Sequence, residues 1–337
     1  MIEQIYYEDD LEEHPGTQDF FRRFPQASKI SCNHYKEIFN PSGQNFRLQK
    51  KKPSLILAKQ RGKRIHSIPE SYGVGGRRNY YFSHLFNCLY DCRYCFLQGM
   101  FPSANYVLFL NYDDFWMDIQ MKTAEEPNHP SWFFSGYDCD SLAMESTTGF
   151  VNYFIPRFAT LPEAFLELRT KSVNIRFLLE HTPIPNVVVA FSFTPQEISQ
   201  QLEHGVPPVS SRIKAMNQLA VKGWNIGIRI DPVIECIDFE KRYSNLFQEL
   251  FVNLPANSIH SVSLGAFRMP ANFFKKIEKL YPNEPLLAGK FEKTGNAVSY
   301  RTEIESHRLE FCYEKLLKYL PSKKLFNCEI QTVDRKC

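Results

Sequence analysis

Apolar runs alternate with amphipathic segments from about residue 79 onward. Residues 186–193 read NVVVAFSF, and their three consecutive valines predict a buried strand. Residues 210–223 carry apolar side chains at helical spacing, and Gly223 is placed to end the helix. The same two patterns predict strands at 106–112, 132–136, 165–171, 225–233, 259–267 and 324–331, and helices at 239–255, 270–282 and 306–320.

This repetition of strand and helix predicts an α/β fold with a parallel sheet, because parallel strands need crossover helices. Five or six such units curve into a full or partial barrel, whose chemistry lies at the carboxyl ends of the strands. We therefore predict a partial (β/α)6-type barrel with an N-terminal extension and a small C-terminal helix–strand addition. Polar residues follow several predicted strands: residues 138–141, Lys171, Ser192 and Asp231.

Residues 1–75 are polar and weakly periodic, and we predict them to be a separate N-terminal extension before a main domain at 76–337. Residues 47–66 hold eight Lys or Arg and no acid. Such a run is often only a solvated face. Here Arg77 and Arg78 follow it, beside Tyr80 and Tyr81. Basic side chains neutralise phosphates and aromatic rings stack on unpaired bases, so the combination favours nucleic-acid binding, to DNA or RNA.

Composition narrows the cellular setting. The formal net charge of +3 is too small to identify a partner, whereas an apolar content of 43% suffices for a large core. The acidic N-terminus lacks the features of a signal peptide, and no apolar run is long enough to span a membrane. Nine cysteines in such a chain favour free thiols in a reducing compartment. We predict a cytoplasmic protein that does not bind membranes.

Three cysteines lie close together in FNCLYDCRYCFLQG, residues 86–99. Cys88, Cys92 and Cys95 follow the spacing C-x3-C-x2-C. One interpretation is a structural zinc site with His84 as a fourth ligand, but zinc sites usually combine two Cys or His pairs and no second pair is present. The other is a [4Fe–4S] cluster held by three thiolates, which leaves one iron open to a small molecule. We favour the cluster.

The motif C-x3-C-x-aromatic-C, with Tyr94 as the aromatic residue, resembles that of radical S-adenosylmethionine enzymes. The resemblance implies two cofactors, a [4Fe–4S] cluster on the three cysteines and S-adenosylmethionine on the open iron. It also implies that one electron from the cluster cleaves S-adenosylmethionine to methionine and a 5′-deoxyadenosyl radical. The protein then orients the cofactor and excludes water.

Residues 80–285, roughly, resemble the spore photoproduct lyase family, through the segment after the cysteines, LRTKS at 168–172 and E-x-G-x6-R at 203–212. The resemblance implies a lyase with a radical S-adenosylmethionine barrel that repairs a thymine lesion in DNA. It places Tyr94, Ser141, Lys171 and Ser192 around S-adenosylmethionine, although each polar residue alone is as readily a strand-end feature. We expect a monomer reduced by flavodoxin or ferredoxin. The alternatives are radical modification of another nucleic acid or a peptide, and a non-catalytic zinc-stabilised nucleic-acid-binding module.

The chain departs from the family pattern at the residues that return hydrogen to the product. Tyr137 aligns with the hydrogen-donating cysteine of the family, and Cys139 follows two residues later. Positions i and i+2 of a strand share a face, so Cys139 would point into the same cavity, unless it is an incidental thiol. Phe96 stands where the family has a tyrosine, and phenylalanine cannot donate a hydrogen atom. The catalytic candidates are therefore Cys139, Tyr137 and Tyr94.

Overall fold

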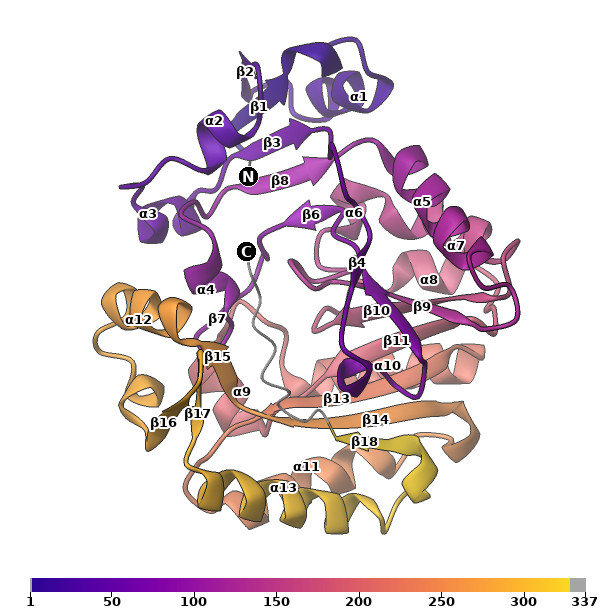
Figure 1. Ribbon diagram of the computed structural model, residues 1–337, viewed down its shortest axis with the longest axis vertical. Helices are drawn as coiled ribbons and strands as arrows, with labels where there is room; N and C mark the ends of the chain where they lie inside the picture. Colours follow the sequence, from indigo (N-terminus) through magenta and orange to yellow (C-terminus); the bar gives the residue numbers. More distant parts are fainter. Residues whose placement is uncertain (1, 328–337) are drawn as a thin grey trace.

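The computed structural model describes residues 2–327, in which a large curled sheet forms most of a barrel (Figure 1). All neighbouring strands are parallel except at one edge, where β4 runs antiparallel to β5. This confirms the predicted partial α/β barrel. In spatial order the strands are β4 (His66–Ser67), β5 (Arg78–Tyr81), β9 (Ser131–Ser135), β10 (Ala164–Thr170), β11 (Val187–Ser192), β13 (Asn225–Val233), β14 (Ile259–Ala266) and β18 (Leu325–Asn327).

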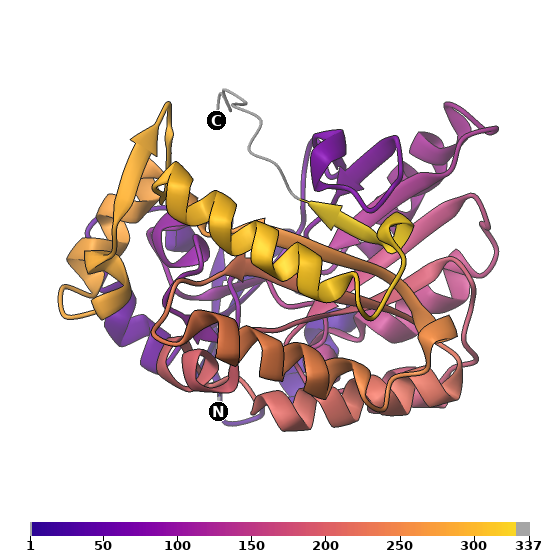
Figure 2. The same cartoon turned by 90° about the horizontal axis from the view of Figure 1, so that it is seen from below.

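Helices cover the outside of this sheet, and α11 and α13 pack side by side (Figure 2). Helix α10 shows why they form: its Ala215, Met216 and Leu219 are buried on one face, and Gly223 ends it at φ +107°. The crossover and C-terminal helices are α5 (Tyr112–Ala124), α6 (Glu145–Thr148), α7 (Phe150–Phe158), α8 (Arg176–Glu180), α9 (Gln196–Leu202), α10 (Val209–Lys222), α11 (Phe239–Phe251), α12 (Ala271–Leu280) and α13 (Thr302–Leu316).

The centre of the sheet is buried on both faces. Every residue of β11 is buried, as expected for a parallel strand covered on both sides. A buried ion pair connects two strands of the sheet: Arg229 Nη2 on β13 lies 2.7 Å from Glu167 Oε2 on β10. Gly227 makes room for it, because a Cβ there would lie 2.8 Å from Arg229 Nη2.

A second sheet contains most of the N-terminal segment. Its order is β2 (Ser28–Cys32), β1 (Gln4–Glu8), β3 (Leu55–Ala58), β8 (Tyr106–Phe109) and β6 (Leu85–Phe86), accompanied by α1 (Pro15–Arg23), α2 (Lys36–Phe39) and α3 (Phe46–Lys51). Of these strands the sequence predicted β8, at 106–112, and missed the others; β3, for example, is short, wholly buried and without alternation. The domain boundary at residue 75 remains a prediction, and strands from both sides of it share both sheets.

Smaller elements complete the chain near the cysteines. Strands β7 (Asp91–Cys92) and β12 (Glu203–His204) pair with each other, and α4 (Leu97–Met100) follows the cysteine loop. An antiparallel sheet follows β14, in the order β15 (Arg268–Pro270), β17 (Ala297–Tyr300) and β16 (Phe291–Thr294). The predicted strand 324–331 is β18 as far as Asn327, and the rest of it lies outside the described residues. No helix in residues 2–327 is both long and apolar enough to cross a membrane.

Candidate active site

The cysteine loop, residues 87–96, is held in place from several directions. Asn87 adopts φ +68°, and its Nδ2 donates to the carbonyl oxygens of Ser103 and Asn105 at 2.8 and 2.7 Å. From the N-terminal segment, Lys50 Nζ donates to the carbonyl oxygen of Cys88 at 2.5 Å. On the barrel side, the backbone N–H of Arg93 donates to the carbonyl of Leu202 at 2.8 Å. These bonds fix a short loop that has little regular structure of its own.

The three cysteines on this loop are free thiols that lie close enough to affect one another. The pKa of Cys88 is raised to about 12, mainly by burial and also by the neighbouring Asp140 and Cys95, while Lys50 opposes the shift. Burial likewise raises the pKa of Cys95, and that of Cys92 well above its usual value. Without metal all three thiols are therefore protonated at neutral pH, and metal binding must release their protons.

This donor set fits a [4Fe–4S] cluster. Within the described residues, no group of three or more His, Cys, Asp or Glu side chains is arranged around one metal ion. A cluster does not require that geometry, because each of its thiolates binds a different iron. His84, the fourth ligand of the zinc alternative, instead stacks on Phe150 at 4.0 Å, and burial lowers its pKa to about 3. The zinc interpretation is not favoured.

Tyr94 ties the loop to the barrel through buried polar groups. Its hydroxyl donates to the Glu203 carboxylate, which also accepts from Ser199 Oγ at 2.6 Å and Arg212 Nη2 at 2.7 Å. Arg212 Nη1 donates to the carbonyl of Ser192 at 2.8 Å, at the end of β11. Burial opposes ionisation of Glu203, but the charges of Arg212 and Lys171 outweigh it and lower the pKa. The sequence analysis included Glu203 and Arg212 only as the first and last residues of the E-x-G-x6-R motif, without a role for either.

Lys171 follows β10 and faces the same loop. Its ammonium nitrogen lies 5.5 Å from the centroid of the Tyr94 ring. Burial would lower the pKa of Lys171, but the nearby Cys92 and Glu203 outweigh it, and the pKa is raised. Its backbone N–H donates to Asp140 Oδ2 at 2.6 Å, which joins the ends of β9 and β10. The structure therefore brings Lys171, Tyr94 and Cys92 together, and the role of Lys171 and Tyr94 in binding S-adenosylmethionine stays a prediction.

The two predicted serines also lie at strand ends. Ser141 is buried, and its Oγ lies 2.9 Å from Ser135 Oγ at the end of β9. Gly136 is required beside it, since a Cβ there would approach Ser141 Oγ to 2.5 Å and φ is +80°. Ser192 is the last residue of β11. Their role in binding S-adenosylmethionine stays a prediction. Asp231 lies within β13 and pairs with Arg268 at 3.3 Å.

Tyr137 and Cys139 point into different surroundings, so the prediction of a shared strand face is wrong. Strand β9 ends at Ser135, and the left-handed Gly136 turns the chain before either residue. The half-buried Tyr137 ring stacks on Tyr81 at 4.4 Å and lies 5.7 Å from Phe96. Cys139 is buried in the core beside the second sheet, where burial raises its pKa well above the usual value and the neighbouring Cys88 raises it further.

The predicted nucleic-acid residues are divided by burial. Arg77 is exposed and Tyr81 is half-buried. Arg78 is buried, and its guanidinium donates to the carbonyl of Lys122 at 2.5 Å at the end of α5. Tyr80 is buried and stacks on Phe133 at 5.5 Å. Arg78 and Tyr80 are therefore corrected to structural residues, because neither side chain presents a surface to a nucleic acid.

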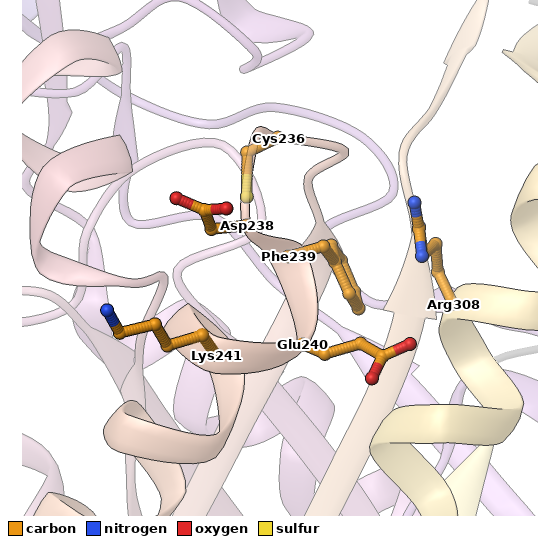
Figure 3. Close-up of a pocket in the computed structure, with 6 residues that line it drawn as sticks. All are labelled: Cys236, Asp238, Phe239, Glu240, Lys241 and Arg308. Atoms are coloured by element: carbon orange, nitrogen blue, oxygen red, sulfur yellow. The ribbon is translucent and has the colours of Figure 1, made fainter.

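An open pocket of about 380 Å³ lies at the start of α11 (Figure 3). It contains none of the predicted site residues. Its lining residues are Cys236, Asp238, Phe239, Glu240, Lys241 and Arg308.

Known proteins similar to this chain agree with the geometry. The chain matches the family described as spore photoproduct lyase over residues 78–301. It is 22% identical over 291 residues to spore photoproduct lyase of a Geobacillus species, covering 84% of this chain and 83% of the relative. It is 23% identical over 292 residues to that of Bacillus subtilis, with the same coverage. A solved spore photoproduct lyase complexed with dinucleoside spore photoproduct has a TM-score of 0.82 at 18% identity, covering 98% of this chain and 99% of that one.

The family match spans more than half of the chain and includes the cysteine loop, Lys171 and Ser192. The structural likeness extends over nearly the whole chain, including the second sheet that the sequence did not predict. The chain belongs to the spore photoproduct lyase family of radical S-adenosylmethionine enzymes.

Proposed function

We propose that the protein is a radical S-adenosylmethionine lyase that repairs a thymine lesion of the spore photoproduct type in DNA. The observation that carries the proposal is the loop with three free thiols, held at the carboxyl ends of the barrel strands by Tyr94, Glu203 and Arg212. The names of its relatives support the substrate class. We also propose that it is a cytoplasmic monomer reduced by flavodoxin or ferredoxin.

In this proposal Cys88, Cys92 and Cys95 hold the cluster. When bound, the cluster supplies the electron that splits S-adenosylmethionine into methionine and a 5′-deoxyadenosyl radical. Tyr94 and Lys171 line the cofactor site together with Ser141 and Ser192. The buried pair of Glu203 and Arg212 acts as positioning residues, because it holds Tyr94 against the end of β11.

Anaerobic reconstitution tests the assignment. The protein should bind about four irons and four sulfides, as a [4Fe–4S] site requires. With dithionite and S-adenosylmethionine it should release 5′-deoxyadenosine, and it should convert a dinucleoside spore photoproduct to thymines. Cys92→Ala should abolish both the binding of iron and the release of 5′-deoxyadenosine. Cys236→Ala, which changes a half-buried cysteine on another loop, should retain both. A Cys92→Ala protein with full activity would refute the cluster.

Tyr137 is our choice of hydrogen donor. Its half-buried ring lies beside Phe96, the residue after Cys95, and stacks on Tyr81. Cys139, buried near Cys88, is the alternative donor. The phenol O–H bond breaks homolytically, the hydrogen atom forms a C–H bond on the thymine product radical, and a hydrogen atom from 5′-deoxyadenosine restores the phenol. Tyr137→Phe should keep release of 5′-deoxyadenosine but divert the product radical to side products. Cys139→Ala is the matched comparison, and clean repair by Tyr137→Phe would exclude this role.

We assign DNA binding to Arg77 and to Tyr81, whose ring stacks on Tyr137. Affinity for DNA should fall steeply with salt, because neutralised phosphates release counterions. Arg77→Glu should weaken binding and flatten the salt dependence, while the absorbance of the cluster stays unchanged. Equal affinity of both proteins at low salt would contradict the placement.

A further inference from the structure

The outer side of the cysteine loop carries a basic surface that the proposed function does not use. We define this outer basic surface by Arg47, Leu48, Lys51, Leu89, Lys275, Lys276 and Lys279. Helices α3, α4 and α12 lie together at the edge of the molecule, outside the curled sheet (Figure 1). Helix α12 packs on α4, and the Arg47 guanidinium lies 5.7 Å from the ring of Tyr281, the residue after α12. The surface is therefore continuous across the loop.

This surface includes two exposed leucines, one of which adjoins a predicted cluster ligand. Leu48 is 60% exposed and Leu89 is 47% exposed. Leu89 directly follows Cys88, whose carbonyl is bound by Lys50 of α3. A protein that covers Leu89 is therefore one residue away from a cluster thiolate. Exposed apolar side chains with a rim of polar ones are typical of a protein interface.

The rim carries positive charge that is not neutralised within the described part of the chain. Arg47, Lys51, Lys275, Lys276 and Lys279 are all exposed. None of the ion pairs among residues 2–327 involves them, and Glu278 is the acidic residue of α12. By contrast, exposed Lys52 pairs with Glu3 at 3.0 Å. Free basic side chains around two exposed leucines are complementary to an acidic protein.

We propose that the outer basic surface docks an acidic one-electron carrier protein, such as a flavodoxin, next to Cys88. This inference rests on the proposed function, because it requires the cluster. One electron leaves the carrier and enters the oxidised cluster, so the carrier is oxidised and the cluster is reduced by one electron. Small, transient, electrostatically steered contacts are typical of such encounters. A nucleic acid could also bind the lysines, but its phosphates would gain nothing from contact with the exposed leucines. Binding of nucleic acid is therefore one outcome of the test.

The test reverses three charges on this surface in the reconstituted protein, with Lys51→Glu/Lys275→Glu/Lys279→Glu. The matched control, Lys214→Glu/Lys222→Glu/Lys318→Glu, changes three exposed lysines on α10 and after α13. The rate of cluster reduction by reduced flavodoxin is followed anaerobically through the loss of cluster absorbance. We expect a decrease of about tenfold or more at low ionic strength for the surface variant and little change for the control. The wild-type rate should fall with salt, and the variant rate should not.

Two further measurements separate the outcomes. Dithionite needs no docking surface, so it should drive release of 5′-deoxyadenosine equally in all three proteins. If it fails in wild type, the proposed function is wrong; if it works while flavodoxin reduces the variant at the wild-type rate, the docking proposal is overturned. A variant that loses DNA affinity but is reduced normally by flavodoxin would reassign the surface to nucleic acid and also overturn the proposal.

Discussion

The two sides of the cysteine loop differ in how their polar groups are satisfied. On the barrel side, Tyr94, Glu203 and Arg212 are buried and joined by hydrogen bonds and an ion pair. On the outer side, Leu48 and Leu89 are exposed among basic side chains. A buried charge must be paired to be tolerated, whereas an exposed charge is solvated at little cost. The barrel side is therefore built to hold a geometry, and the outer side is free to meet a partner.

The largest change in stability should come from breaking the buried ion pair of Glu203 and Arg212. Glu203→Gln leaves Arg212 buried without a counter-ion, and we expect the free energy of unfolding to fall by about 3–5 kcal/mol. Chemical denaturation of the metal-free protein measures it. Glu197→Gln, which changes an exposed residue of the preceding helix α9, is the control and should change stability by less than about 0.5 kcal/mol. Equal stabilities of the two variants would contradict the importance of the pair.

A second buried pair in the barrel predicts how stability depends on pH. Burial opposes ionisation of Glu167, but the charges of Arg229 and Arg169 outweigh it and lower the pKa from 4.5 to about 2. The stabilisation is complete above the unfolded pKa, near pH 4.5, and is lost as the pH falls towards 2. The shift corresponds to about 3 kcal/mol. Glu167→Gln, less stable at neutral pH, should show a weaker loss of stability over this pH range, and an unchanged slope would exclude this group.

A smaller effect is expected at the hydroxyl that connects the loop to the pair. Tyr94→Phe removes one hydrogen bond to an ionised carboxylate, while Ser199 and Arg212 still satisfy Glu203. The cost should be about 2 kcal/mol. Combining Tyr94→Phe with Glu203→Gln should give less than the sum of the two losses, because both changes remove the same contact. Strict additivity would show that the hydroxyl acts independently of Glu203.

The smallest change in stability, about 1 kcal/mol, should come from Lys50→Met at the boundary of the two sides. This change removes the hydrogen bond to Cys88 and a positive charge near the cluster. Because that charge stabilises the more negative, reduced cluster, the reduction potential should become more negative. A redox titration followed by electron paramagnetic resonance measures the potential. Lys52→Met, whose ammonium pairs with Glu3, is the control, and equal potentials in both variants would contradict the effect.

Strong local patterns in the sequence made part of the fold and of the candidate site predictable. The valine run of β11 and the helical spacing of α10 were found nearly at their observed ends. The cysteine spacing predicted the metal ligands, and their assignment stays a prediction. In the second sheet β8 was predicted, but β3 was missed because burial on both faces removes the alternation that marks a strand.

The sequence by itself determined the parallel α/β pattern and the three thiols on one loop, because both depend on residues that are near neighbours in the chain. Only the tertiary structure decided the rest. Lys50 reaches Cys88 from helix α3, 38 residues earlier in the chain, and Tyr94 meets Glu203 across more than a hundred residues. Tertiary structure also decided the role of Arg78. Its basic side chain is typical of a nucleic-acid contact, but it is buried against α5. Such contacts join residues distant in the chain, and no local pattern encodes them.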